Sequence, residues 1–145
     1  LRSLFGVWAE ETDFVGEKLT RRVEVAAGNS VGLVDGVFES GLACDVLHLE
    51  GAEAVLTFAE DFYAGRAAAT CHRVGKGEAH YFGAMFEEEL LDAYLGALIR
   101  QTGLTAAVGD LPQPLPSGVS VSIRESARGP VVFVMNFSAR PARVD

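Results

Sequence analysis

The chain has 145 residues, a formal net charge of −8 and a sequence pI near 4.8. Hydrophobic residues make up 49% and charged residues 22%, a composition that is typical of a globular protein and excludes an intrinsically disordered one. An acidic surface repels phosphate groups, so the charge argues against binding to nucleic acid or to an anionic membrane. No apolar run approaches the ~18 residues of a membrane span, so we expect none.

The two cysteines, Cys44 and Cys71, lack metal-type CxxC spacing, and we expect both to be reduced strand residues that behave as small hydrophobes. The first residues carry no signal-peptide pattern and no initiator Met. These features predict a cytoplasmic location and a segment that belongs to a longer polypeptide.

The predicted elements begin with a helix end at residues 1–5, because Gly6 follows as a helix-terminating glycine. Alternation or apolar runs then predict short extended segments at 7–11, 19–26, 31–34, 37–39, 43–49, 54–59, 67–73 and 78–83. Arg21 interrupts the apolar face of the second of these segments. The last two flank Val74-Gly75-Lys76-Gly77, which predicts a β-hairpin turn.

The clearest element is a helix that opens with Glu87, Glu88 and Glu89, where the positive end of the helix dipole favours acids. A stripe at helical spacing predicts its buried face: Leu90, Leu91, Tyr94, Leu95, Leu98 and Ile99. Arg100 and Gly103 are typical of the helix end.

A proline-rich stretch, 110–116, holds three of the five prolines and predicts a stiff linker. We therefore expect a domain at residues 1–106, a linker at 107–117 and a small antiparallel β domain at 118–145 that is cut short. Its predicted strands are 119–124 and 131–137.

The search for a nucleophile or a phosphate site ends without a candidate. Cys71 and His72 are strand neighbours, so their side chains should point to opposite faces. Cys44 lacks the strand-turn-helix elbow on which amidotransferases place their nucleophile. The Gly75-Lys76-Gly77 segment lacks the remaining glycine and Ser/Thr of a phosphate loop.

Other polar clusters fit a structural interpretation better than a catalytic one. Of the histidines His48, His72 and His80, the last two could pair across the hairpin, and a metal site there would need a third ligand such as Glu78. Successive acids on a helix diverge by about 100°, so Glu87–Glu89 cannot converge on one sugar as glycosidase carboxylates do. The cluster Glu10, Glu11 and Asp13 is expected at the surface of a strand end.

The loop Asp61-Phe62-Tyr63-Ala64-Gly65-Arg66 carries two adjacent aromatic residues, Phe62 and Tyr63. We expect them to plug the sheet end, with exposure to a sugar or a partner as the alternative. We therefore assign no catalytic, cofactor-binding or metal-ligating residue.

The order of several segments resembles glycoside hydrolase family 42 β-galactosidases over nearly the whole chain. The segments are Leu1-Arg2, Gly6-Val7, Glu10-Glu11-Thr12-Asp13, Cys44-Asp45-Val46-Leu47, Glu50-Gly51-Ala52-Glu53, the loop 61–66, Arg73-Val74-Gly75-Lys76-Gly77-Glu78-Ala79, Tyr81-Phe82-Gly83 and the strand 132–136. No one of them is diagnostic, but their order and spacing are fairly specific.

The first domain mixes strands with one clear late helix and the second is all-β, which predicts an α/β fold followed by a small antiparallel module. The resemblance implies that the first domain is the second half of a flavodoxin-like domain of the class I glutamine amidotransferase type, which builds a trimer interface, and that a small antiparallel β domain follows. It further implies a parent enzyme with an N-terminal (β/α)8 barrel that holds two catalytic glutamates and cleaves terminal β-D-galactosides with retention. That barrel is not in this chain, so no catalytic residue is transferred and this chain alone is expected to be inactive.

Two alternatives stay open. The chain could be a stand-alone carbohydrate- or protein-interaction module, or a diverged amidotransferase or hydrolase that uses Cys71 or Cys44. The resemblance favours a non-catalytic oligomerisation and scaffold segment, without a cofactor.

Overall fold

The computed structural model describes residues 1–104 and 115–144. The chain divides into two compact units, Leu1–Thr102 and Gly103–Asp145, which are described separately. The domain boundary predicted at residue 106 and residues 107–114 of the predicted linker lie outside the described residues.

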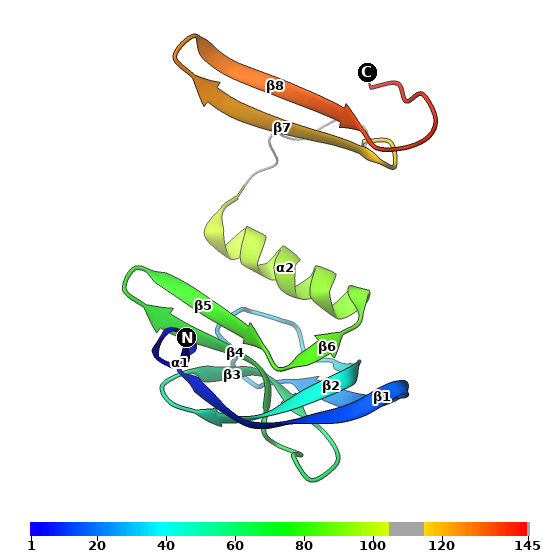
Figure 1. Ribbon diagram of the computed structural model, residues 1–145. Coiled ribbons are helices and arrows are strands. Elements are labelled where there is room, and N and C mark those ends of the chain that lie inside the picture. The colour runs from blue at the N-terminus through cyan, green and yellow to red at the C-terminus, as the bar shows by residue number, and fades with distance from the viewer. Residues whose placement is uncertain (105–114, 145) are drawn as a thin grey trace. The chain divides into compact units, whose positions relative to one another are not determined.

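The first unit is a curled antiparallel sheet with one long helix (Figure 1). Its elements are α1 (Arg2–Phe5), β1 (Val7–Val25), β2 (Val37–Leu49), β3 (Glu53–Phe58), β4 (Ala67–Val74), β5 (Gly77–Phe82), β6 (Ala84–Phe86) and α2 (Glu88–Thr102). The strand order is β5-β4-β3-β1-β2-β6, and each pair of neighbours is antiparallel.

Gly83 joins the two ends of this sheet and nearly closes it into a barrel. It lies between β5, which pairs with β4, and β6, which pairs with β2. The Gly83 amide donates to Ala68 O of β4 at 2.8 Å, and the Asp45 amide of β2 donates to Gly83 O at 2.6 Å. A side chain here would lie 3.0 Å from Leu47 Cδ1 and 3.2 Å from Ala68 O, so glycine lets the two edges approach closely.

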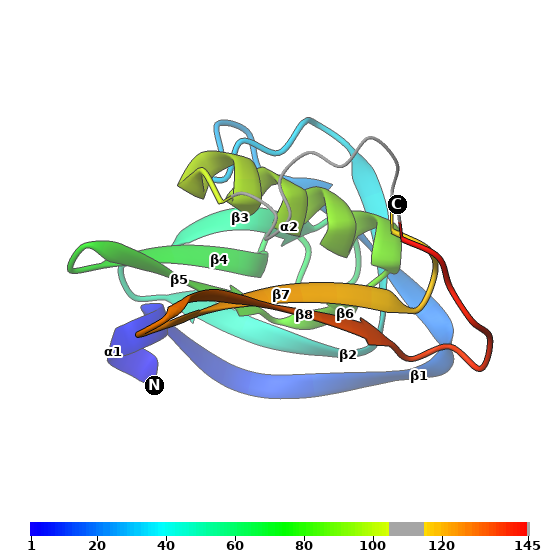
Figure 2. The same cartoon turned by 90° about the horizontal axis from the view of Figure 1, so that it is seen from above.

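Helix α2 covers one side of the curled sheet in both views (Figures 1 and 2). Leu90, Tyr94 and Ala97 are buried in the same core as Val23, Val55, Leu56 and Phe58 of the strands. The helix, its acidic first turn and Gly103 at φ +66° are confirmed. Two of the six residues of the predicted stripe are wrong, because Leu95 and Ile99 remain 48% and 49% exposed.

The predicted α/β, flavodoxin-like or class I amidotransferase-like fold is wrong. The first unit is mostly β, and its strands pair only in the antiparallel sense. A parallel crossover needs a connection of about a dozen residues or more, usually a helix. The connections 50–52, 59–66 and 75–76 are too short for such a crossover.

Several predicted short segments are parts of longer strands. The segments 7–11 and 19–26 belong to β1, and 37–39 and 43–49 belong to β2, because irregular pairing at Gly16 and at Leu42 (φ +60°) absorbs the interruptions. The segment 31–34 forms no strand; Asn29 fastens it by hydrogen bonds of its side chain to the backbone of Leu33. The hairpin around Gly75 (φ +61°) is confirmed.

In the second unit, β7 (Val119–Ser126) and β8 (Gly129–Asn136) form an antiparallel hairpin, which confirms the two predicted strands. Both faces of β8 remain accessible, since residues 131–135 are 40–58% exposed. Among the described residues, neither helix has the length and apolar character needed to cross a membrane.

Candidate functional site

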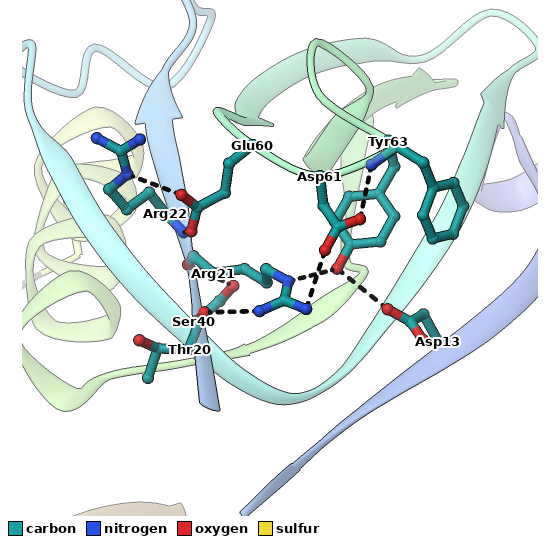
Figure 3. Close-up of polar contacts among 9 residues, drawn as sticks. Asp13, Thr20, Arg21, Arg22, Ser40, Glu60, Asp61 and Tyr63 are labelled. Atoms are coloured by element: carbon teal, nitrogen blue, oxygen red, sulfur yellow. Dashed lines mark hydrogen bonds and ion pairs between the residues drawn. The ribbon is translucent and has the colours of Figure 1, made fainter. Parts of the chain in front are cut away.

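The most connected polar cluster of the first unit joins the β3–β4 loop to β1 (Figure 3). Its central group is Tyr63, whose hydroxyl donates to Asp13 Oδ2 at 3.2 Å and accepts from Arg21 Nε at 3.2 Å. Arg21 also pairs with Asp61 through Nη2 and Oδ2 at 2.9 Å. These contacts hold β1 and the β3–β4 loop together at one end of the barrel.

The loop is built so that Tyr63 points inward. The amide of Gly65 donates to Phe58 O at 2.7 Å, and the amide of Phe58 donates to Arg66 O at 2.9 Å. The Tyr63 ring packs on Phe58 with centroids 4.7 Å apart and is fully buried. Burial raises the pKa of the Tyr63 hydroxyl well above its usual range, so the phenol stays protonated and acts as a donor.

The aromatic loop therefore does two things at once. Tyr63 plugs the barrel end as expected, while its neighbour Phe62 is 65% exposed and lies edge-on to the Tyr63 ring. Arg21, which interrupts the alternation of β1, pairs with Asp61 and donates to Tyr63 at this end of the barrel. The charged residue on an apolar face was the sequence signal for this cluster, and its partners were not identified from sequence.

The carboxylates Glu10, Glu11 and Asp13 diverge to separate partners. Glu10 Oε2 lies 2.6 Å from His48 Nε2, whereas Asp13 bonds to Tyr63 and Glu11 is exposed. The acids Glu88 and Glu89 occupy the first turn of α2 and are exposed. None of these groups is arranged as a facing pair of catalytic carboxyls.

A second cluster surrounds Trp8 at the start of β1. The Trp8 ring stacks on His48 with centroids 4.8 Å apart, and the Arg2 guanidinium lies 5.7 Å from the Trp8 ring centroid. Arg2 is itself paired with Glu50. Trp8 remains 42% exposed beside a shallow pocket of about 200 Å³, so this aromatic patch is accessible to a partner.

Cys71 and His72, which are neighbours on β4, do not form a nucleophile–base pair. Cys71 and His72 point to opposite faces, as predicted: Cys71 is buried, and His72 Nδ1 lies 2.9 Å from Leu4 O of α1. The suggested pairing of His72 with His80 is wrong, because the register places Cys71 opposite His80 and His72 opposite Ala79.

The register thus brings Cys71 Sγ to 3.9 Å from His80 Nε2, a contact that sequence reasoning missed. Burial raises the pKa of the Cys71 thiol, and burial likewise raises the pKa of the Cys44 thiol. Since the thiolate is the nucleophilic form, both environments disfavour cysteine catalysis.

The outer edge of β1, meaning the side of residues 7–21 that faces away from β2, is a long unpaired strand edge of the unit. Within the described residues, this stretch pairs with β2 alone, and β3 joins β1 only from Val23 onward. It lies at the margin of the sheet in Figure 2. Trp8, Phe14 and Leu19 on it are 42%, 68% and 56% exposed.

The sequence of this chain is similar to those of known β-galactosidases. The chain is 40% identical over 146 residues to β-galactosidase BglY of Alicyclobacillus acidocaldarius and 34% identical over 145 residues to β-galactosidase Pbg of Clostridium perfringens. These alignments cover 99% and 100% of this chain but 20% of each relative, so the chain spans about a fifth of their length.

Solved structures give the same result. The structure of the cold-adapted β-galactosidase from Rahnella sp. R3 superposes with a TM-score of 0.75 at 33% identity, over 95% of this chain and 20% of that one. The family of the β-galactosidase trimerisation domain matches residues 1–105. The chain therefore belongs to the trimerisation-domain family of glycoside hydrolase family 42 β-galactosidases.

Proposed function

We propose that this chain is the non-catalytic oligomerisation and scaffold segment of a retaining β-galactosidase that hydrolyses terminal β-D-galactosides. The observation that carries the proposal is the family match over residues 1–105, with relatives named β-galactosidases that are about five times longer. Hydrolysis then belongs to residues of the longer protein that lie outside this chain.

The surface of the first unit supports an interface role. The outer edge of β1 combines unpaired backbone groups with the exposed side chains of Trp8, Phe14 and Leu19. Such an edge invites pairing with another chain, and charged residues on it limit indiscriminate association. Glu10, Glu11, Glu17 and Lys18 supply these charges, so the edge is suited to a specific partner, which we take to be copies of the same protein in a trimer.

Two further features fit the proposal. Glu10, Asp13 and Asp61 contact His48, Tyr63 and Arg21 respectively, which accords with a structural role for these three carboxyls and with chemistry placed elsewhere. Cys44 and Cys71 are both free thiols, which is the usual state in a reducing compartment and supports a cytoplasmic location.

Sedimentation equilibrium of the full 145-residue chain tests the interface. We expect self-association toward three times the 15.4 kDa chain mass. Phe14→Glu should shift the equilibrium toward monomer, because it places a charge on the proposed contact. The matched control is Val34→Glu in the β1–β2 connection, where the side chain is 85% exposed and the association should be unchanged.

A hydrolysis assay tests the other half of the proposal. The pure chain should not turn over a chromogenic β-galactoside, and measurable turnover would refute a non-catalytic role. A chain that is monomeric at all concentrations, with Phe14→Glu indistinguishable from the unmodified chain, would instead favour a stand-alone interaction module.

A further inference from the structure

The inner face of the β4–β5 hairpin gathers three side chains with different donor atoms. Cys71 of β4 lies directly opposite His80 of β5, and Glu78 is two positions before His80, so all three share one face of the hairpin. Cys71 Sγ is 3.9 Å from His80 Nε2, and Glu78 Oε2 is 3.8 Å from the same nitrogen. One donor atom from each residue lies within 4.8 Å of the other two.

A sulfur, an imidazole nitrogen and a carboxylate oxygen form a donor set that zinc accepts. In a tetrahedral zinc site with ordinary bond lengths, neighbouring donor atoms are about 3.4–3.6 Å apart. The observed separations from His80 Nε2 exceed this by a few tenths of an ångström. Small rotations of the Cys71 and Glu78 side chains would close the site without moving the backbone.

The surroundings orient the ligands as an outer shell does in metal proteins. His80 Nδ1 lies 3.0 Å from the hydroxyl of Tyr94, a fully buried residue of α2, so Nε2 is directed toward the thiol. When Nδ1 carries the proton and donates to Tyr94, the lone pair of Nε2 is free for a metal. Arg73 Nε lies 3.4 Å from Glu78 Oε1, the carboxylate oxygen on the other side from His80.

An additional polar group and a small cavity adjoin the thiol. The Ser30 hydroxyl oxygen is buried and makes no hydrogen bond within the described residues. Ser30 and Cys71 both line a pocket of about 140 Å³, which has room for a water molecule as a fourth ligand.

We propose that Cys71, Glu78 and His80 form a zinc site that fastens the β4–β5 hairpin to α2. From the sequence we assigned no metal ligand. The metal site that we considered there combined His80 and Glu78 with His72, and His72 instead contacts Leu4 O of α1. The inferred role is structural, since the three ligands would hold β4 and β5 together and would fix the His80 ring, whose other nitrogen contacts Tyr94 of α2. The site is independent of the proposed oligomerisation, because it lies on the inner face of the sheet.

Titration of the full chain with Co²⁺ in the absence of oxygen tests the site, because cobalt reports its ligands in its absorption spectrum. We expect a thiolate-to-cobalt charge-transfer band that saturates at one ion per chain and is abolished by added Zn²⁺. Cys71→Ser should remove the band, whereas the matched variant Cys44→Ser, which changes the other buried thiol, should retain it. Glu78→Gln and His80→Gln should each weaken binding at least tenfold.

Zn²⁺ should also raise the unfolding temperature of the unmodified chain, since an ion that binds only the folded state stabilises it. At the same Zn²⁺ concentration the rise should be smaller in Glu78→Gln, in proportion to its weaker binding. Glu78 has a 23% exposed side chain, so its amide variant should fold even if the change at buried Cys71 does not. Circular dichroism without metal verifies the fold of each variant.

Three results would overturn the proposal. They are a folded chain that gives no sulfur-to-cobalt band, a band that disappears with Cys44→Ser and persists with Cys71→Ser, and unchanged cobalt affinity in Glu78→Gln. Cobalt bound without a sulfur band would point to the exposed His48–Glu10 pair instead, and would count against the site.

Discussion

The barrel of residues 1–102 and the β7–β8 hairpin are both made of antiparallel strands, yet only the barrel encloses a core. In the barrel, Val23, Val55 and Leu56 have no exposed surface. In the hairpin, each residue from 131 to 135 keeps 40–58% of its surface exposed. Pairing of strands satisfies the backbone in both, but burial requires a sheet that closes on itself and a helix that covers it. The stability of the hairpin must therefore depend on what packs against it.

The largest expected effect compares the same substitution in the two units. Phe58→Ala removes a ring that is 1% exposed in the barrel, and should lower the free energy of unfolding by about 3–5 kcal/mol. Phe133→Ala removes a ring that is 42% exposed in the hairpin, and should cost less than about 1 kcal/mol. Urea unfolding followed by the fluorescence of Trp8 measures the barrel. An equal loss for both variants would show that the hairpin contributes to the same cooperative core.

The next effect tests the close approach of backbone segments within the barrel. Gly6 has φ +60°, and a Cβ there would lie 2.7 Å from His72 Cγ and 2.9 Å from the amide nitrogen of Ala52. Gly6→Ala should cost about 1–2 kcal/mol for the left-handed backbone and about 1–3 kcal/mol more for the crowding. Gly28→Ala is the control, since Gly28 has φ +68° and nothing within 4 Å of the added atom. Equal losses in urea unfolding would mean that backbone strain alone explains the effect at Gly6.

The same contrast explains what could be predicted from sequence. The hairpin at Gly75, the helix that ends before Gly103 and the strands 119–124 and 131–137 depend on local chemistry, and each is present. Glycines at turns and helical periodicity depend on residues only a few positions apart, so a single sequence is enough to predict them.

The pairing of strands that are distant in the chain could not be predicted from such local signals. The α/β prediction came from the mixture of strands with one helix and from a family resemblance, whereas the short connections 50–52 and 75–76 favour antiparallel neighbours. The irregular pairing in β1 hid one long strand behind two short predictions. The Cys71–His80 contact depends on the hairpin register, and the partners of Arg21 come from a loop some forty residues away in the chain, so neither followed from spacing alone.

A smaller effect tests the polar end of the barrel. Tyr63→Phe keeps the buried ring but removes the hydroxyl that bridges Asp13 and Arg21, and should cost about 1–2 kcal/mol in urea unfolding. Phe62→Ala at the adjacent exposed position should change stability by less than about 0.5 kcal/mol. If Tyr63→Phe were as neutral as Phe62→Ala, this end of the barrel would be held by packing alone.

The last prediction concerns the ionisation of tyrosine at alkaline pH. This ionisation reports on the barrel alone, because all three tyrosines lie in the barrel and none in the hairpin. Donation to Asp45 and burial raise the pKa of Tyr81 to about 12, and burial raises the pKa values of Tyr63 and Tyr94. In the unfolded chain a tyrosine titrates near 10. A pKa that is higher in the folded state stabilises the fold fully below pH ~10 and loses this contribution as the pH rises toward 12.

The phenolate absorbance should therefore stay low in the native chain at pH ~11 and be fully developed at the same pH in urea. Tyr81→Phe should begin to show phenolate only when the circular dichroism of the barrel is lost, because Tyr63 and Tyr94 are its remaining reporters. Phenolate that appears near pH 10 while the barrel is still folded would place these hydroxyls in contact with solvent. In that event the barrel would be as open as the hairpin, and the contrast between a closed core and an uncovered strand pair would fail where it is most directly measured.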